Sequence, residues 1–379
     1  MTKEVNLKQD GLNFSRRLRR TPFTSSAEKY GVKGFSVVNH ALLPKAFATS
    51  IEEDYWHLRS AVQIWDVGVQ RQVEIIGPDA AKLVQYMTPR SLEKMKVGNC
   101  YYIPLIDENG GMINDPVLLK HSETHYWLSI ADSDVLLWAK GLAVGLKVNV
   151  SINEPDVWPL AIQGPLAKDL LSEVFGNFIK DIKFFKFSNI QFEGSKQIIA
   201  RSGYSKQDGF EIYLQGFDLG EKLWEILWEK GKKFNIAPGC PNLIDRIEAG
   251  LLSYGNEITL DTSPLEVGME NFCSPNFSHD FVGKAALREL QEKGVTRKIK
   301  GVIFDVPPCP PCTKPWAIYN ENKIKMGQIT SAIFSPRIGK NIGLGLINKP
   351  LWKHGTNVLI EIPMTKSFIK GTVSDLPFE

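Results

Sequence analysis

A short stretch, ARSGYSKQDGFEIYL (residues 200–214), brings a carboxylate and two phenols close together in the chain. Large apolar residues alternate along FEIYL, so Glu211 and Tyr213 share the other side of a predicted strand, and Tyr204 comes just before it. An unpaired carboxylate is costly to bury, and on local evidence a solvent-facing acid is the commoner case. The nearby rings favour a second interpretation, because aromatic faces stack on a flat heterocycle whose N–H groups a carboxylate accepts.

A second isolated acid, Asp115, lies on the outgoing side of a predicted hairpin, DENGGMINDP. The Asn-Gly-Gly turn is a strong hairpin signal, because glycine and asparagine accept the positive φ that tight turns need. Asp115 directly precedes Pro116, where a regular strand ladder cannot continue. Its carboxylate therefore either faces solvent or points at a ligand.

Motifs for several other chemistries do not occur in the sequence. It contains no G-x-x-x-x-G-K-[ST], no G-x-G-x-x-G after a strand and no G-x-S-x-G. His121 and His125 fall in a predicted strand–turn–strand, where residues four apart do not share a face as they do on a helix. Cys309 and Cys312 form a C-P-P-C whose prolines prevent the helix that a redox dithiol opens, and no second pair completes a zinc site. We therefore expect no metal.

Composition limits the class of protein. The chain has 379 residues, enough for two or three domains, and its net charge of +3 is too small to indicate nucleic-acid binding. No apolar run is long enough to cross a bilayer, and the first residues lack the apolar centre of a secretory signal. The five cysteines are odd in number. We expect a cytoplasmic protein with free thiols and with neither a membrane nor a nucleic acid as partner.

The order of predicted elements indicates an α+β fold. Strands and turns fill residues 65–132, and a second set of strands follows from LAIQGP to FEIYLQG. From about residue 297 the pattern changes to short strands without a helix, which is typical of a small all-β barrel or sandwich. Four helices are predicted at residues 132–146 (with Asp and Ser able to cap it), 165–176, 218–234 and 241–256.

Five motifs follow one another along nearly the whole chain: AVQIWDVGVQRQVEIIGPDAAKLVQYMT, YYIPLIDENGGMINDPVLL, LAIQGPLAKDLL, RSGYSKQDGFEI and IEAGLLSYGNEI. Each is loose by itself, but their order and spacing together are specific. The sequence resembles the glycine-cleavage T-protein family of tetrahydrofolate-dependent aminomethyltransferases.

The resemblance implies a three-domain cloverleaf around tetrahydrofolate, with a C-terminal β-barrel domain. We accordingly expect a folate-binding α+β domain formed by residues 1–55 and 150–265, a second α+β domain over residues 56–149, and the barrel over residues 295–379.

The resemblance also assigns roles to single residues. The family's pterin-binding glutamate falls at Glu211, its aspartate beside folate N5 at Asp115, and a tyrosine lining that site at Tyr102. It therefore implies that Asp115 is catalytic and that Glu211, Tyr102 and Tyr204 bind the cofactor, tetrahydrofolate.

Departures from the family pattern bear on the substrate. GYSKQ (residues 203–207) replaces the G-Y-T-G-E of an aminomethyltransferase, and Asn242 replaces the arginine that opens R-D-x-L-R-L-E-A-G. These changes, with SIEEDYWHLR, VQIWDV, PGCPNLIDRIE and the ending DLPFE, resemble the branch of the family that demethylates dimethylsulfoniopropionate. That branch implies a small sulfonium donor, with Tyr204 and Tyr213 as walls of its pocket. We assign Lys206 to the donor's carboxylate.

Two alternatives stay open at this point. One is a transferase acting on glycine betaine, dimethylglycine, sarcosine or an aminomethyl-lipoyl carrier. The other is a non-enzymatic folate-binding protein, although RSGYSKQDGFE lacks the cysteine of the K-G-C-Y-x-G-Q-E signature of such proteins. The expected partners are the small-molecule donor and a second copy of the chain in a homodimer.

Overall fold

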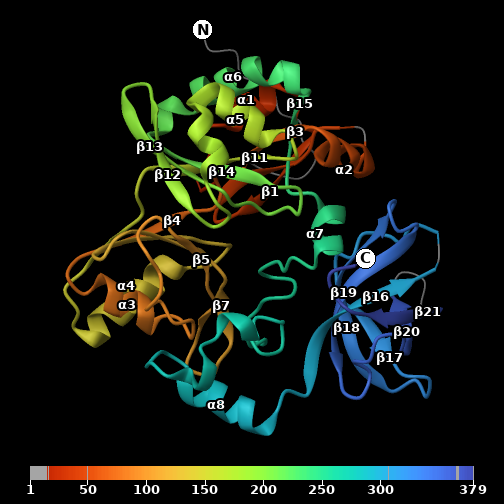
Figure 1. Ribbon diagram of the computed structural model, residues 1–379. Coiled ribbons are helices and arrows are strands. Elements are labelled where there is room, and N and C mark those ends of the chain that lie inside the picture. The colour runs from red at the N-terminus through yellow and green to blue at the C-terminus, as the bar shows by residue number, and fades with distance from the viewer. Residues whose placement is uncertain (1–14, 16, 49, 306, 364–366, 379) are drawn as a thin grey trace.

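The computed structural model describes residues 15, 17–48, 50–305, 307–363 and 367–378. Figure 1 shows three lobes arranged around α7 and the irregular segment that follows it. Two lobes mix helices and strands and the third is a barrel, so the predicted α+β class with a C-terminal β-barrel is confirmed. Among the described helices, none combines the length and apolarity that a membrane span requires.

The first lobe contains a six-stranded sheet covered by helices on one face (Figure 1). Leu160, Phe210 and Ile212 point to that face and pack with Trp224 of α6 in one buried cluster. The predicted alternation of FEIYL is therefore confirmed, with Glu211 and Tyr213 on the opposite face. In sheet order the strands are β12 (Phe187–Phe192), β13 (Ser195–Ala200), β14 (Gly209–Gln215), β11 (Val157–Gln163), β3 (Val62–Asp66) and β15 (Ile236–Gly239), and the helices are α1 (Thr24–Lys29), α5 (Ala167–Phe175) and α6 (Gly220–Gly231).

The second lobe contains a five-stranded antiparallel sheet with two helices on its outer face. Its strands in order are β10 (Ser151–Asn153), β4 (Gln72–Ile76), β9 (His125–Ser129), β8 (Val117–Ser122) and β5 (Cys100–Tyr102), and its helices are α3 (Ala80–Tyr86) and α4 (Val135–Leu146). The predicted helix at 132–146 is confirmed as α4, but the side chain of its N-cap residue, Asp134, makes no capping hydrogen bond.

The predicted DENGG hairpin is present beside this sheet. It joins β6 (Leu105–Ile106) to β7 (Met112–Asn114). Gly110 has φ +83°, a conformation that glycine adopts without strain. A Cβ on Gly111 would come within 2.1 Å of the Leu260 carbonyl oxygen, so the hairpin also needs a glycine for close packing against the segment after α7.

The second sheet does not begin and end at the predicted domain boundaries, residues 56 and 149. The helix α2 (Ile51–Ser60) runs into β3, and β3 pairs with β11 and β15 of the first sheet. Val62 and Ile64 are buried in the core of the first lobe, which holds this strand there. At the other boundary, β10 pairs with β4, so the second sheet extends to Asn153. A separate hairpin of β1 (Gly34–Val38) and β2 (Ala41–Ala46) precedes α2.

The third lobe is a closed six-stranded barrel in which β16 pairs with both β19 and β21. Alternate residues such as Val302, Ile318 and Ile360 fill its interior. Its strands in barrel order are β16 (Arg297–Phe304), β19 (Lys340–Asn348), β18 (Lys325–Ser335), β17 (Trp316–Tyr319), β20 (Asn357–Ile362) and β21 (Ser367–Ser374); α8 (Lys284–Lys293) precedes it.

The helix α7 (Leu243–Ala249) lies where the lobes meet. It is shorter than the predicted helix over 241–256, because Gly250 takes φ +68° and ends it. Asn242 caps its first turn by accepting hydrogen bonds from the Ile244 and Asp245 N–H groups. Asn242, the residue that departs from the family's arginine, therefore has a structural function here.

A buried ion pair connects α7 to the barrel. Arg246 Nη1 lies 2.9 Å from Glu257 Oε2, and both side chains are almost fully buried. Thr330 and Ser331 of β18 donate to the other Glu257 oxygen at 2.8 and 2.6 Å. Every oxygen of this carboxylate is thus paired, which is the condition under which a buried charge is tolerated.

Removal of the Glu257 carboxylate tests this connection. We expect Glu257→Ala to lower the free energy of unfolding by about 3–5 kcal/mol, because Arg246 would be left buried and unpaired. The control is Asp305→Ala, which breaks an exposed barrel pair with Lys340 and should cost about 0–1 kcal/mol. Urea unfolding followed by circular dichroism gives both values, and equal losses in the two variants would contradict the prediction.

Candidate active site

Glu211 lies between the two sheets. It is 5% exposed, at the centre of β14, on the face opposite the helices. That face packs on the second sheet through a cluster that includes Tyr213, Cys100 and Trp127. The solvent-facing interpretation of Glu211, favoured by local evidence, is therefore wrong, because a second sheet covers the face that an isolated strand would expose to water.

The Glu211 carboxyl has small side chains as neighbours and one hydroxyl group as a hydrogen-bond donor. Its cross-strand neighbours, Ala161 and Ala200, have small side chains. Ser202 donates a hydrogen bond to Oε2 at 2.5 Å. Burial raises the pKa of Glu211, and the hydrogen bond from the Ser202 hydroxyl opposes that shift. A carboxylate held in this way can accept N–H groups from a ligand.

Tyr213 is fully buried in the packing between the sheets. Its ring centroid lies 6.4 Å from that of Trp127. Its hydroxyl is buried and makes no hydrogen bond of ordinary geometry within the described residues. Burial raises the pKa of Tyr213 well above its ordinary value, and the neighbouring Glu211 carboxylate raises it further.

Asp115 and Tyr102 form a second pair at the edge of the second lobe. The Tyr102 hydroxyl donates to Asp115 Oδ2 at 2.7 Å, whereas Oδ1 is buried without a hydrogen-bond partner in the part of the chain that the structure describes. Burial raises the pKa of Asp115 to about 7. An unpaired buried carboxylate oxygen is costly, and it identifies a position at which a ligand would supply the missing donor or proton.

Tyr204 joins this pair from the first lobe. Its hydroxyl donates to the Leu252 carbonyl, which fixes the ring. Burial raises the pKa values of Tyr102 and Tyr204, and the nearby Asp115 carboxylate raises both further. The three groups are therefore close together. The structure therefore brings Asp115, Tyr102 and Tyr204 together from two lobes.

Lys206 is placed differently. Its side chain is exposed, and its backbone N–H donates to Asp245 Oδ2 at 3.0 Å. Gln207 Nε2 donates to Asp245 Oδ1 at 2.7 Å. The part of residues 203–207 that departs from the family is thus anchored to the buried Asp245 of α7. No ion pair of the Lys206 ammonium group occurs among the described residues.

Sequence reasoning missed Ser202 and Asp245, which hold Glu211 and the 203–207 loop. Serine and aspartate have no distinctive local pattern, and their partners lie nine or more residues away in sequence. Nor does the sequence reveal that Arg90 contacts Tyr102, since the contact depends on how β5 and the loop after α3 fold together.

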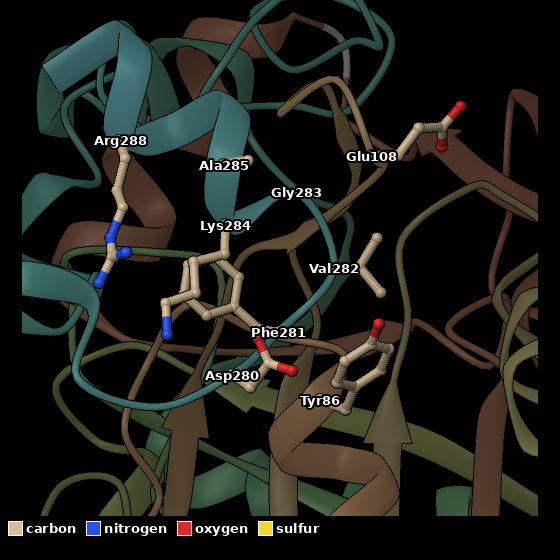
Figure 2. A pocket seen from close by; sticks show the side chains of 9 residues that line it. All are labelled: Tyr86, Glu108, Asp280, Phe281, Val282, Gly283, Lys284, Ala285 and Arg288. Carbon is tan, nitrogen blue, oxygen red and sulfur yellow. The ribbon is translucent and has the colours of Figure 1, made fainter. Parts of the chain in front are cut away.

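Two cavities lie elsewhere. One of about 400 Å³ lies between α3, the β6–β7 turn and the start of α8. In Figure 2, Glu108 points away from Lys284 and Arg288. The charged side chains that line this cavity therefore do not converge on one ligand. A second, of about 480 Å³, is lined by His121, Trp127 and Phe187. No group of three or more His, Cys, Asp or Glu residues in the described chain is arranged to hold a metal ion.

Asp115 should make stability depend on pH. A pKa of about 7 in the folded chain, against the ordinary aspartate value of 3.8, means that folding favours the protonated acid. The free energy of unfolding should fall by up to about 4 kcal/mol as the pH rises from about 4 to 7, at ~1.36 kcal/mol per unit. Asp115→Asn should remove the contribution of Asp115, whereas Asp66, whose pKa burial also raises to about 7, should keep its own. Chemical denaturation at pH 5 and pH 8 measures it, with the exposed Asp181→Asn as control; identical pH profiles for wild type and Asp115→Asn would refute the prediction.

Known proteins resemble this chain over nearly all its length. Residues 23–276 match the GCVT N-terminal domain family, and residues 297–378 match the glycine cleavage T-protein C-terminal barrel domain. The dimethylsulfoniopropionate demethylase DmdA of Ruegeria pomeroyi is 46% identical over 92% of this chain and 94% of its own. An aminomethyltransferase of Bacillus cereus is 35% identical over 95% of this chain and 98% of its own.

A solved structure has the same fold. The aminomethyltransferase T of the glycine cleavage system from Bartonella henselae has a TM-score of 0.86, with 24% identity, over 96% of this chain and 98% of its own. The predicted cloverleaf fold is thereby confirmed. The chain is an enzyme that belongs to the glycine-cleavage T-protein family.

Proposed function

We propose that the enzyme transfers a methyl group from the sulfonium of dimethylsulfoniopropionate to N5 of tetrahydrofolate, giving methylthiopropionate and 5-methyltetrahydrofolate. The 46% identity to a dimethylsulfoniopropionate demethylase over almost the whole chain supports the donor. The observation that carries the proposal is the buried acid Asp115, whose Oδ1 lacks a partner, close to the fixed Tyr204 ring where two lobes meet.

The first lobe supplies the groups that fit a pterin. Glu211 can accept its N–H groups, with Ser202 holding Oε2 and with the small side chains of Ala161 and Ala200 as cross-strand neighbours. When bound, tetrahydrofolate supplies the neutral N5 amine that accepts the methyl group. Tyr102 and Tyr204 are proposed to lie against the cofactor.

The methyl donor would be positioned by aromatic side chains. A sulfonium leaves as a neutral thioether, so the enzyme mainly has to position the reactants, which contributes up to about 7–11 kcal/mol in well-oriented systems. The Tyr204 face would hold the cation by a cation–π contact worth about 0.5–2 kcal/mol, and Tyr213 is proposed as a second wall of the pocket.

Asp115 is proposed as the catalytic residue. Tyr102 orients its carboxyl through Oδ2 and leaves Oδ1 for the ligands. With a pKa of about 7, Asp115 is partly ionised at neutral pH, so it can stabilise a sulfonium when charged and hold a proton after transfer. Lys206 remains a prediction for the donor's carboxylate, and a homodimer and a cytoplasmic location also remain predictions from the sequence.

A second function has support from the relatives named aminomethyltransferase. The alternative donors carry the transferred carbon on nitrogen, as in the quaternary ammonium compound glycine betaine or the amines dimethylglycine, sarcosine and an aminomethyl-lipoyl carrier. The sulfonium proposal is preferred because identity to the demethylase is 46%, against 35% to the Bacillus cereus aminomethyltransferase.

The donor is tested by incubating the enzyme and tetrahydrofolate with dimethylsulfoniopropionate, glycine betaine, dimethylglycine or sarcosine in parallel. We expect 5-methyltetrahydrofolate, detected by mass spectrometry, with the sulfonium at a rate at least ten times that with each nitrogen compound. Faster transfer from any of the nitrogen compounds would exclude the proposed substrate.

The role of Glu211 is tested by binding. We expect Glu211→Gln to weaken tetrahydrofolate binding about 10- to 100-fold, because charge-assisted hydrogen bonds to the pterin are lost while the shape is kept. Isothermal titration calorimetry measures the affinity. The control is Glu221→Gln on the exposed surface of α6, and similar affinities for both variants would show that Glu211 does not bind the pterin.

A further inference from the structure

A half-buried arginine lies beside the candidate active site. Arg90 stacks its guanidinium on two rings, with Cζ 4.2 Å from the Tyr101 centroid and 5.0 Å from that of Phe272. Its Nη1 donates to the Tyr102 carbonyl oxygen at 2.6 Å. These three contacts fix the plane of the guanidinium.

The charge of Arg90 has no acidic partner among the described residues. Other arginines with little exposure are paired: the partly buried Arg71 with Glu154 and Arg297 with Glu266, and the almost fully buried Arg246 with Glu257. A guanidinium has five N–H donors, of which the described contacts of Arg90 use one. Burial lowers the pKa of Arg90, which reflects the cost of holding this cation without a counter-charge.

Tyr102 connects Arg90 to the proposed catalytic residue. Its carbonyl accepts from Arg90 and its hydroxyl donates to Asp115. Phe272, which lies under the guanidinium, also packs edge-on against the Tyr102 ring at 5.3 Å. The unpaired cation and the unpaired Asp115 oxygen are therefore at opposite ends of one residue.

We propose that Arg90 binds a carboxylate of a substrate and thereby sets its position relative to Asp115. The inference rests on the proposed function, since dimethylsulfoniopropionate carries a propionate and tetrahydrofolate a glutamate. A fixed guanidinium is suited to a carboxylate because its fork donates two parallel hydrogen bonds. The Lys206 side chain, by contrast, is exposed.

Kinetics with paired substrates distinguish the two carboxylates. We expect Arg90→Gln to raise KM about 10- to 100-fold for whichever substrate it binds, with kcat changed less than threefold. If that substrate is the donor, trimethylsulfonium, which has no carboxylate, should keep its KM, or its Ki when it is not turned over. If it is folate, the dissociation constant of tetrahydrofolate should rise and that of tetrahydropteroate, which lacks the glutamate, should not.

Three variants separate binding from structure. Arg90→Lys keeps the charge and should recover part of the KM loss, and exposed Lys94→Gln removes a nearby charge and should have no effect. Equal losses with the carboxylate-bearing and carboxylate-free ligands, or a loss in kcat alone, would show that Arg90 only supports the Tyr102 backbone and would overturn the inference.

The proposed function and this inference can fail separately. If wild-type enzyme forms no 5-methyltetrahydrofolate from the sulfonium, the donor is wrong. Calorimetric comparison of tetrahydrofolate with tetrahydropteroate, and of carboxylate-bearing with carboxylate-free donors, still measures whether Arg90 binds a carboxylate.

Discussion

The packing of the six-stranded sheet against the five-stranded sheet is the constraint on which the site depends. It removes Glu211 and Tyr213 from water, although their strand alternates like one with a solvent-facing side. A buried carboxylate needs hydrogen bonds, and Ser202 supplies one from the same sheet. Burial without full pairing is a feature of ligand sites, where the missing partner comes with the ligand.

The same principle applies to Asp115 and Arg90 at the two ends of Tyr102. One Asp115 oxygen lacks a donor, and the Arg90 cation lacks a carboxylate, within the described chain. Each would be destabilising in a purely structural core. Together they describe a site with a positive and a negative end, which matches a ligand that carries a cation and a carboxylate.

The third lobe acts on this site through α7. Arg246 and Glu257 join the helix to the barrel, and Asp245 holds the backbone of the 203–207 loop that carries Tyr204. The barrel therefore helps to fix the position of the Tyr204 ring, although Tyr204 belongs to another lobe. Substitutions in α7 are therefore expected to change the position of Tyr204.

The α+β class, the barrel, the strands around Glu211 and the family can be predicted from the sequence, because alternation, turn residues and ordered motifs are local signals. Glu211, Tyr204 and Asp115 stand out in the residue pattern, and the resemblance to the family adds their roles and Tyr102. The sequence does not reveal that β3 belongs to the first sheet, that α7 ends at Gly250, that Lys206 is exposed or that Arg90 lies beside Tyr102. These features depend on the tertiary structure, because burial and pairing of a charge depend on the segments that fold over it, and these are distant in the chain.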